Sequence, residues 1–275
     1  MTVLTRIIGY LGLSAVLFAF AFPVLWMFSY SLRSTELPPP IKFELFVLPL
    51  AWDNYVRVLN TLPLARYAWN SLLVVAGAVP LTLITASWTG LALTQVSPRV
   101  RRALLLMSIA LLLVPAPALW LPRFILYTQI GWINTLFALI APALMGTSPF
   151  YAIMFYIAFA RVPADLFESA QLEGANILQV WARVALPLVR PTAVAVAVLS
   201  FVFYWSNFID PFLYLRSEAN FTLPVGVQLL QQVMRSNWPL LMAAAMMMVA
   251  PVLAVFLVAQ RLFLQGEITL ARWLR

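Results

Sequence analysis

The chain alternates between long hydrophobic runs and shorter segments that hold most of its charge. Six runs come close to or exceed the roughly 20 apolar residues that a helix needs to cross a bilayer. These runs are 7–32, 68–95, 103–121, 134–160, 188–213 and 240–264. Prolines within them are compatible with spans, because neighbouring helices and water satisfy the freed carbonyls. The pattern predicts an all-α, polytopic membrane protein with six transmembrane helices in a single domain, 1–275.

Composition supports this class and excludes several kinds of chemistry. Hydrophobic residues make up 64% of the chain and charged residues only 9%, whereas soluble domains carry roughly a quarter charged residues. Cysteine and histidine do not occur in the sequence, so disulfides, thiolate chemistry and the common zinc sites are excluded. A membrane-embedded enzyme is disfavoured, because the runs also lack paired carboxylates.

The basic residues indicate the orientation of the chain in the membrane. The net charge of +8 is spread over arginines at the ends of the apolar runs, which fits topology signals better than a nucleic-acid surface. Six spans place both termini on one side, together with ten of the basic residues, against seven opposite. The bias increases when the long loop 33–67 is discounted, so both termini are expected in the cytoplasm. Run 7–32 lacks a small-residue cleavage pattern and is expected to remain as a span.

Two segments on the predicted outer side are long enough to have structure of their own. Segment 33–67 is rich in proline and aromatic residues, and Asp53-Asn54-Tyr55 within it is a candidate start of a short helix. Segment 214–239 is the second extracytoplasmic loop. Connections longer than about 12–15 residues are often functional, so the pair is interpreted as an external docking surface, with ordinary connections as the alternative.

Segment 161–187 carries the strongest local signals in the chain. Pro163 suits the first position of a helix, and Asp165 places a negative charge in the first turn. Gly174 suits the left-handed residue that ends a helix. Asn176 followed by Gln179 has the spacing of a capping box, which predicts a second helix. The segment is therefore expected to form two short helices on the cytoplasmic side.

The first of these helices is too short to be stable alone. Leu166, Phe167 and Ala170 form an apolar stripe on only two or three turns, a length that is marginal in water. The stripe therefore needs a groove on a partner, or else the segment is a hairpin that lies on the lipid headgroups. Periodicity leaves both interpretations open.

The spacing of this segment resembles a known signature. Glu168-Ser169-Ala170 is followed by three residues, Gly174, nine residues and Val184-Ala185-Leu186-Pro187. The order is similar to the loop of permease subunits of bacterial ATP-binding-cassette (ABC) importers, which reads Glu-Ala-Ala, three residues, Gly, nine residues, Ile-x-Leu-Pro. The substitutions at Ser169 and Val184 are small changes in shape.

The resemblance extends over nearly the whole chain, to the carbohydrate-uptake branch that includes the smaller membrane subunit of the maltose transporter. The segments that carry it are Pro23-Val-Leu-Trp-Met-Phe, Ser31-Leu-Arg33, Asp53-Asn-Tyr55, Asn70-Ser71-Leu72, Trp132-Ile-Asn134-Thr135, Thr222-Leu-Pro-Val-Gly226 and Gln260-Arg261.

The resemblance implies a type I ABC importer permease fold in the inner membrane and no catalysis by this chain. It implies two cytoplasmic ATPase subunits that bind ATP and magnesium, a second homologous permease subunit and an extracytoplasmic solute-binding protein. Loop 161–187 would be the coupling loop, whose first helix docks in a cleft of an ATPase. The implied coupling residues are Asp165, Leu166, Phe167, Glu168, Ser169, Ala170, Glu173, Gly174, Leu186 and Pro187.

The candidate substrate path is the end of the fifth run. Asp210 is the main ionisable residue within a run, and such residues are functional candidates by default. Tyr204, Trp205, Ser206 and Asn207 combine aromatic faces with hydroxyl and amide groups, a chemistry suited to sugars. The alternatives are aromatic anchors at the membrane interface and a hydrated acid. The scarcity of charge within the runs also argues against a proton- or sodium-coupled carrier.

Three functions follow from these observations. The first is a permease subunit that imports a sugar or oligosaccharide, with a polyol, a glycerol phosphate diester or an amino sugar as alternative solutes. The second is a membrane-embedded enzyme, and the third is a membrane scaffold or sensor that transports nothing.

Overall fold

The computed structural model describes residues 3–37 and 44–273, and the side chains of residues 9–37 and 44–262. Regular secondary structure within the described residues is entirely helical, which confirms the all-α prediction. The chain divides into two compact units, residues 1–66 with 225–251 and residues 67–224 with 252–275. Helices α3, α13 and α14 each continue from one unit into the other.

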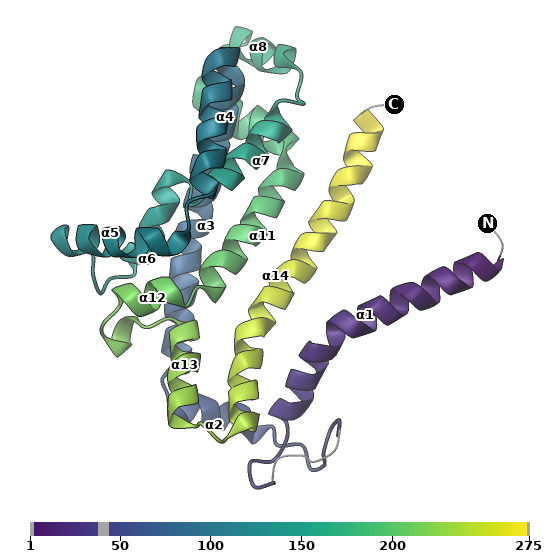
Figure 1. Ribbon diagram of the computed structural model, residues 1–275. Coiled ribbons are helices and arrows are strands. Elements are labelled where there is room, and N and C mark those ends of the chain that lie inside the picture. The colour runs from purple at the N-terminus through teal and green to yellow at the C-terminus, as the bar shows by residue number, and fades with distance from the viewer. Residues whose placement is uncertain (1–2, 38–43, 274–275) are drawn as a thin grey trace. The chain divides into compact units, whose positions relative to one another are not determined.

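The helices follow one another along the chain as Figure 1 shows. In order they are α1 (Val3–Ser31), α2 (Asp53–Thr61), α3 (Leu64–Gln95), α4 (Pro98–Leu112), α5 (Ala116–Gln129), α6 (Phe137–Ile140), the 3-10 helix η1 (Ala141–Met145), α7 (Pro149–Phe159), α8 (Ala164–Leu172), α9 (Ile177–Gln179), the π-helix η2 (Val180–Ala185), α10 (Leu186–Leu188), α11 (Arg190–Ser206), α12 (Ile209–Tyr214), η3 (Glu218–Asn220), α13 (Leu223–Val233) and α14 (Trp238–Trp273).

The described residues contain four stretches, either one helix or a nearly collinear series of helices, that are long and apolar enough to cross a membrane. They are Gly9–Ser31, Leu64–Gln95, Phe137–Phe159 and Trp238–Leu262. Two further pairs of helices meet the same test together but are bent, by 92° between α4 and α5 and by 88° between residues 177–188 and α11. The number of spans reaches six if each bent pair counts as one, so the exact number stays a prediction.

Three of the expected runs are interrupted in the structure, and two of them break at positions that the sequence did not mark. The run 103–121 is not one helix, because α4 ends at Leu112 and Pro115 precedes α5 with extended backbone angles. Proline has no N–H to continue the hydrogen-bond pattern, and its ring clashes with the preceding turn. The run 188–213 is also divided, since α11 ends at Ser206 and Asn207 is extended before α12 begins at Ile209.

The run 134–160 divides at the Gly146–Pro149 junction, which the sequence marked as a possible break. Gly146 and Thr147 both have positive φ angles, +76° and +57°. Ser148 then accepts a hydrogen bond from the amide of Phe150 and begins α7. Thr147 is an unusual residue for this conformation, and its side-chain bonds are described below.

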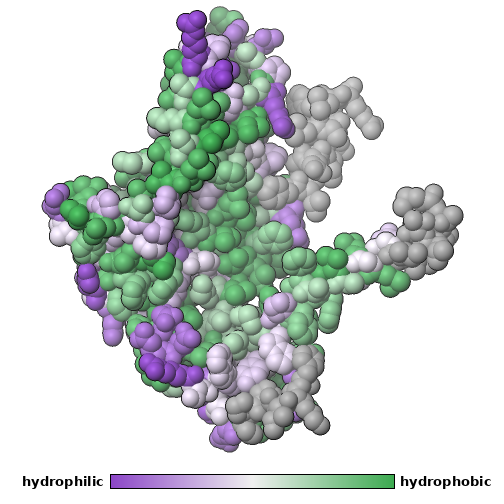
Figure 2. Space-filling model, in the orientation of Figure 1, coloured by the Kyte–Doolittle hydropathy of each residue, from purple (hydrophilic) through white to green (hydrophobic). Residues whose placement is uncertain are grey.

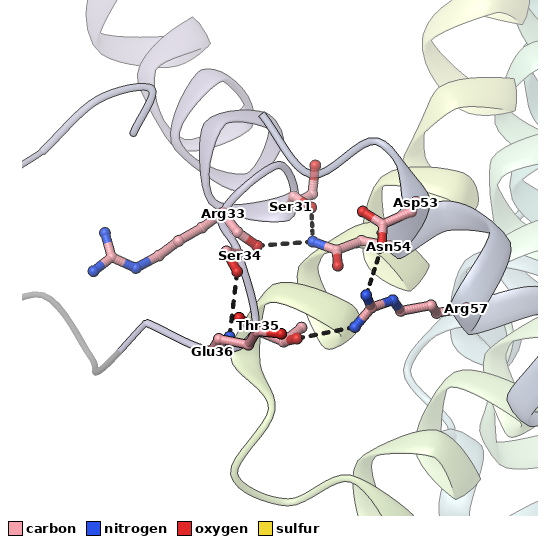
Figure 3. A network of polar contacts seen from close by, with 8 residues as sticks. All are labelled: Ser31, Arg33, Ser34, Thr35, Glu36, Asp53, Asn54 and Arg57. Carbon is pink, nitrogen blue, oxygen red and sulfur yellow. Dashed lines mark hydrogen bonds and ion pairs between the residues drawn. The ribbon is translucent and has the colours of Figure 1, made fainter. Parts of the chain in front are cut away.

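In the first unit, the short helix α2 confirms the helix expected at Asp53, and it fixes the end of α1. The Asn54 side chain is buried and donates hydrogen bonds of 2.8 Å to the carbonyls of Ser31 and Arg33 (Figure 3). The Ser31 hydroxyl in turn lies 2.8 Å from the Tyr55 hydroxyl. Two of the segments that carry the family resemblance, Ser31–Arg33 and Asp53–Tyr55, are thus joined in one network.

In the second unit, the core forms where α3 crosses α7. Phe155 and Phe159 of α7 are buried and stacked, with ring centroids 5.9 Å apart. Gly90 of α3 faces them, and a Cβ atom at this position would lie 2.5 Å from Phe155 Cβ and 2.8 Å from the Tyr156 amide nitrogen. The two backbones approach this closely only because Gly90 has no side chain.

We predict that Gly90→Ala destabilises the protein by about 1–3 kcal/mol, the usual cost of overpacking a closely packed site. Thermal unfolding of the purified protein in detergent would measure the effect as a lower midpoint. Gly12→Ala on α1 is the matched control, because nothing lies within 4 Å of its added methyl group. A midpoint for Gly90→Ala equal to that of the control would contradict the prediction.

Candidate functional site

Helix α8, the first helix of the segment expected to be the coupling loop, lies at the end of the second unit where α3 ends and α4 begins (Figure 1). It begins at Ala164, and Pro163 precedes it with extended backbone angles of φ −57° and ψ 133°. Pro163 is therefore the N-terminal flanking residue and not the first helical residue, so that expectation was wrong by one position. Asp165 lies in the first turn as predicted.

The end of α8 confirms the role expected for Gly174. Its φ angle is +86°, and its amide donates to the Gln171 carbonyl at 2.9 Å. The next amide, of Ala175, donates to the Ala170 carbonyl at 3.0 Å. This pair of bonds is a Schellman motif, which satisfies carbonyls that the end of the helix would otherwise leave open.

The second element of the loop begins with the predicted capping box. The Gln179 amide donates to the Asn176 side chain, and the Asn176 amide donates to the Gln179 side chain, both at 2.9 Å. The α-helix continues for only three residues and then widens into the π-helix η2. Pro187 has no N–H for the Arg183 carbonyl, so a regular α-helix cannot pass this point. The expected second helix is therefore mostly a π-helix.

The side chains of the loop divide into an inner and an outer set. Phe167 and Leu186 pack against the core of the second unit, and Ala170 is half-buried. Asp165, Leu166, Glu168, Ser169, Glu173, Gly174 and Pro187 are exposed. The predicted stripe of Leu166, Phe167 and Ala170 therefore does not face one direction, because Phe167 points inward while Leu166 stays 45% exposed.

Three exposed apolar residues near α8 were not identified from the sequence. Leu172 is 89% exposed, Ile177 69% and Leu178 55%. They flank the Gly174 turn, so their position next to a helix stop was the signal that could have found them. Together with Leu166 they form an apolar rim, named here the loop rim. Hydrophilic side chains also gather at this end of the second unit, as the space-filling view shows (Figure 2).

A cleft of about 500 Å³ separates α8 from the ends of neighbouring helices. Its polar lining includes Gln95, Arg101, Glu168 and Gln171. Arg101 donates to the carbonyls of Thr94 and Val96, at 3.2 and 3.0 Å, and so closes the end of α3. Among the described residues, no hydrogen-bond or ion-pair partner is present for the Glu168 carboxylate, which leaves it available to a partner protein.

The predicted substrate-path residues fall into two separate groups. Tyr204 and Trp205 are buried in α11. The Tyr204 hydroxyl lies 2.6 Å from the hydroxyl of Thr147, which lies 2.8 Å from that of Thr82 on α3. Trp205 stacks on Phe201, with centroids 5.8 Å apart and planes inclined by 9°. Both aromatic residues of this group are therefore held by other parts of the second unit.

The second group lies at the break after α11. Ser206 is exposed, and the Asn207 side chain donates to the Asp210 carboxylate at 2.8 Å. The other oxygen of that carboxylate is 3.7 Å from the guanidinium of Arg123, a residue of α5. Sequence reasoning missed Arg123, because nothing local indicates that α5 and α12 meet. The result is a half-buried cluster of amide, carboxylate and guanidinium groups.

Further segments that carry the family resemblance meet at the 214–223 connection. Asn134, whose φ is +62°, accepts hydrogen bonds on its side-chain oxygen from the amides of Arg216 and Ser217, at 3.0 and 2.9 Å. Asn70 donates to the carbonyls of Ala219 and Phe221, at 2.8 and 2.9 Å. These side chains fix the shape of a connection that has little regular structure of its own.

We predict that Gly174→Val loosens the end of α8, because a left-handed conformation costs about 1–2 kcal/mol for residues with a Cβ. Hydrogen exchange of the Gly174 and Ala175 amides should be faster in this variant. Gly174→Asn is the control, since asparagine tolerates this conformation, and its exchange should stay near that of the wild type. Equal protection in Gly174→Val would show that the glycine is not required.

Comparisons with known proteins place this geometry in a family. Residues 78–267, more than half of the chain, match the family described as "Binding-protein-dependent transport system inner membrane component". The chain is 30% identical over 263 residues to the arabinooligosaccharides transport system permease protein AraQ of Halalkalibacterium halodurans, covering 93% of this chain and 92% of AraQ. It is 27% identical over 270 residues to the lactose transport system permease protein LacG of Rhizobium radiobacter, covering 97% of each.

A solved structure confirms the fold. A crystal structure of a bacterial ABC transporter involved in the import of the acidic polysaccharide alginate contains a chain that matches with a TM-score of 0.77. The two chains are 22% identical, and the match covers 96% of this chain and 99% of the other. The chain therefore belongs to the family of binding-protein-dependent transport system inner membrane components, as a non-catalytic permease subunit of an ABC importer.

Proposed function

We propose that the chain forms half of the translocation pathway of an ATP-driven sugar importer, with both termini and the coupling loop 161–187 in the cytoplasm. The observation that carries this proposal is the form of α8. It is a short helix with a closed C-terminal end, an exposed apolar rim and a carboxylate, of Glu168, that has no partner among the residues that the structure describes. These features support a protein partner over a hairpin that lies on lipid headgroups.

The proposed partner of α8 is an ATPase subunit. The Schellman motif and the capping box hold the loop in shape without help from another protein, so little ordering is needed on binding. The loop rim offers apolar area, and the exposed carboxylates of Glu168 and Glu173 offer two acceptors for basic groups. ATP and magnesium would be bound by two such ATPases, whose closure moves α8 as a rigid body.

A sugar or oligosaccharide is the proposed solute, delivered by an external solute-binding protein. The names of AraQ and LacG refer to arabinooligosaccharides and lactose, which favours a sugar or oligosaccharide over a polyol or a glycerol phosphate diester. Within the chain, the cluster of Ser206, Asn207, Asp210 and Arg123 is the proposed contact with sugar hydroxyls. Tyr204 and Trp205 would reach the path only after α11 moves, since both are buried in this conformation.

The outer segments 33–67 and 214–239 are the proposed contact with the solute-binding protein. In the first unit, a cleft of about 530 Å³ opens between residues of these two segments. Its lining includes Arg33, Arg235, Asn237 and Trp238, a set of planar polar and aromatic groups that is typical of protein interfaces. The apolar α1 stays exposed along most of its length, and it would face lipid or a second, homologous permease subunit.

We predict that the double variant Glu168→Lys, Gly174→Asp uncouples ATP hydrolysis from transport without preventing membrane insertion. The lysine reverses the charge offered to the ATPase, and the aspartate places a negative charge at the C-terminal end of α8, where the helix dipole disfavours it. The assay is sugar uptake and ATP hydrolysis by the complete complex in proteoliposomes with loaded solute-binding protein.

The matched control is Glu168→Asp, Gly174→Asn, which keeps a carboxylate and a residue that tolerates positive φ. Uptake in the control should stay close to the wild type. Wild-type uptake by the charge-reversed variant would contradict the proposed docking. If neither an ATPase nor a second permease co-purifies with the chain, the result would favour the third function, a membrane scaffold that transports nothing.

A further inference from the structure

The coupling loop is joined to the membrane-spanning helices by one side-chain hydrogen bond. The indole nitrogen of Trp181 donates to the hydroxyl of Ser87 on α3 at 3.0 Å. Within the described parts of the chain, every other side-chain hydrogen bond of residues 161–187 stays inside the loop. The Trp181–Ser87 bond is therefore the specific polar link between the loop and the spans.

In this link the Ser87 hydroxyl both donates and accepts a hydrogen bond, and the Trp181 indole N–H has its acceptor. Ser87 is fully buried, and its own proton is directed to the Ile84 carbonyl at 3.1 Å. Its oxygen therefore accepts from Trp181, whose indole nitrogen can only donate. The Trp181 ring also makes an edge contact with Trp88, with centroids 5.5 Å apart. Two adjacent residues of α3 thus hold one side chain of the loop.

Trp181 lies in the part of the loop that is attached to the core. It belongs to the π-helix η2, whose first and last residues, Val180 and Ala185, are buried. Ala185 packs in the same cluster as Ala86 of α3 and Phe155 of α7, with Trp181 against it. π-helices are rare and occur frequently at functional sites.

Helix α8 is attached differently. The cleft of about 500 Å³ separates it from the ends of α3, α4 and α7, and Phe167 is its one side chain in the core cluster of the second unit. The loop therefore consists of an outer helix that stands away from the spans and an inner segment, η2, that is fixed to α3. Phe167 connects α8 to the core cluster directly, and η2 provides a second connection from the loop to α3.

Helix α3 connects this segment to the interior of the second unit. Thr82, on the same helix, is bonded to Thr147, and Thr147 to Tyr204 of α11. Thr147 has a positive φ angle at the break before α7. This conformation is strained for a residue other than glycine. A movement of α3 would thus act on the junction of three helices, one of which ends at the proposed substrate path.

We propose that Trp181 is a positioning residue that transfers displacement of the coupling loop to α3 through its hydrogen bond with Ser87. This inference rests on the proposed transport function, and it adds a specific residue pair to it. The bond sets the position of α3 relative to the loop. Its loss should therefore lower the amount of sugar transported per ATP hydrolysed. Assembly of the complex and the rate of ATP hydrolysis should change less.

Two variants test the link in the complete importer. Trp181→Phe removes the N–H donor and keeps an aromatic ring, and Ser87→Ala removes the acceptor. Each should lower the amount of sugar transported per ATP hydrolysed by about fivefold, the lower end of the usual range for energetic coupling between sites. The double variant should be no worse than either single variant, because both remove the same bond.

Thr89→Ala is the control on the same helix, since within the described part of the chain the Thr89 hydroxyl bonds only to the Thr85 carbonyl of its own helix, at 2.8 Å. Its transport per ATP should match the wild type. If Trp181→Phe does not assemble with the ATPase, Ser87→Ala alone decides the result. Uptake and hydrolysis that fall in proportion, with an unchanged ratio, would show a merely structural role and overturn the inference.

The two proposals fail in distinguishable ways. A wild-type complex that transports sugar with ATP, while both variants keep the wild-type ratio, removes the role of Trp181 and leaves the transport function intact. A wild-type complex without ATP-dependent uptake overturns the transport function and this inference together.

Discussion

The close crossing of α3 and α7 is the contact on which the second unit depends. At Gly90 the backbone of α3 lies directly against Phe155 and Tyr156, and the surrounding side chains form a buried cluster. The same cluster includes Ala185 and Val189, which lie at the end of the proposed coupling loop, just before α11. The packing of α3 against α7 and the position of the loop therefore depend on the same cluster, and this cluster can form because Gly90 has no side chain.

Polar groups in this protein concentrate where helices break. A bilayer offers no water to the backbone, so irregular segments must be satisfied by side chains from elsewhere in the chain. Thr147 at the break before α7 is bonded to Thr82 and Tyr204. Asn134 plays the same role for the 214–223 connection. In the first unit, Asn54 closes the end of α1. The shape of these irregular segments is held by these few side chains and by the apolar packing around them.

The sequence predicted best what is determined locally. The left-handed Gly174 and the reciprocal bonds of Asn176 and Gln179 depend on neighbouring residues only, and both were confirmed. The signature spacing identified the family. The bend between α4 and α5 was missed, because the residues on both sides of Pro115 are apolar and hydropathy carries no information on the direction of the chain. The ion pair of Arg123 with Asp210 and the bond of Trp181 with Ser87 were missed because they join segments far apart in the chain.

The exposed loop rim has a consequence for the life of the subunit in the cell. Leu172 and Ile177 leave large apolar surfaces in water, and such surfaces are what chaperones and proteases recognise on incompletely assembled proteins. If an ATPase subunit binds at this rim, as proposed above, a permease chain made in excess of that subunit would leave these side chains exposed. The abundance of the permease would then follow the supply of the ATPase, because the proposed docking surface would also mark chains that are not yet assembled.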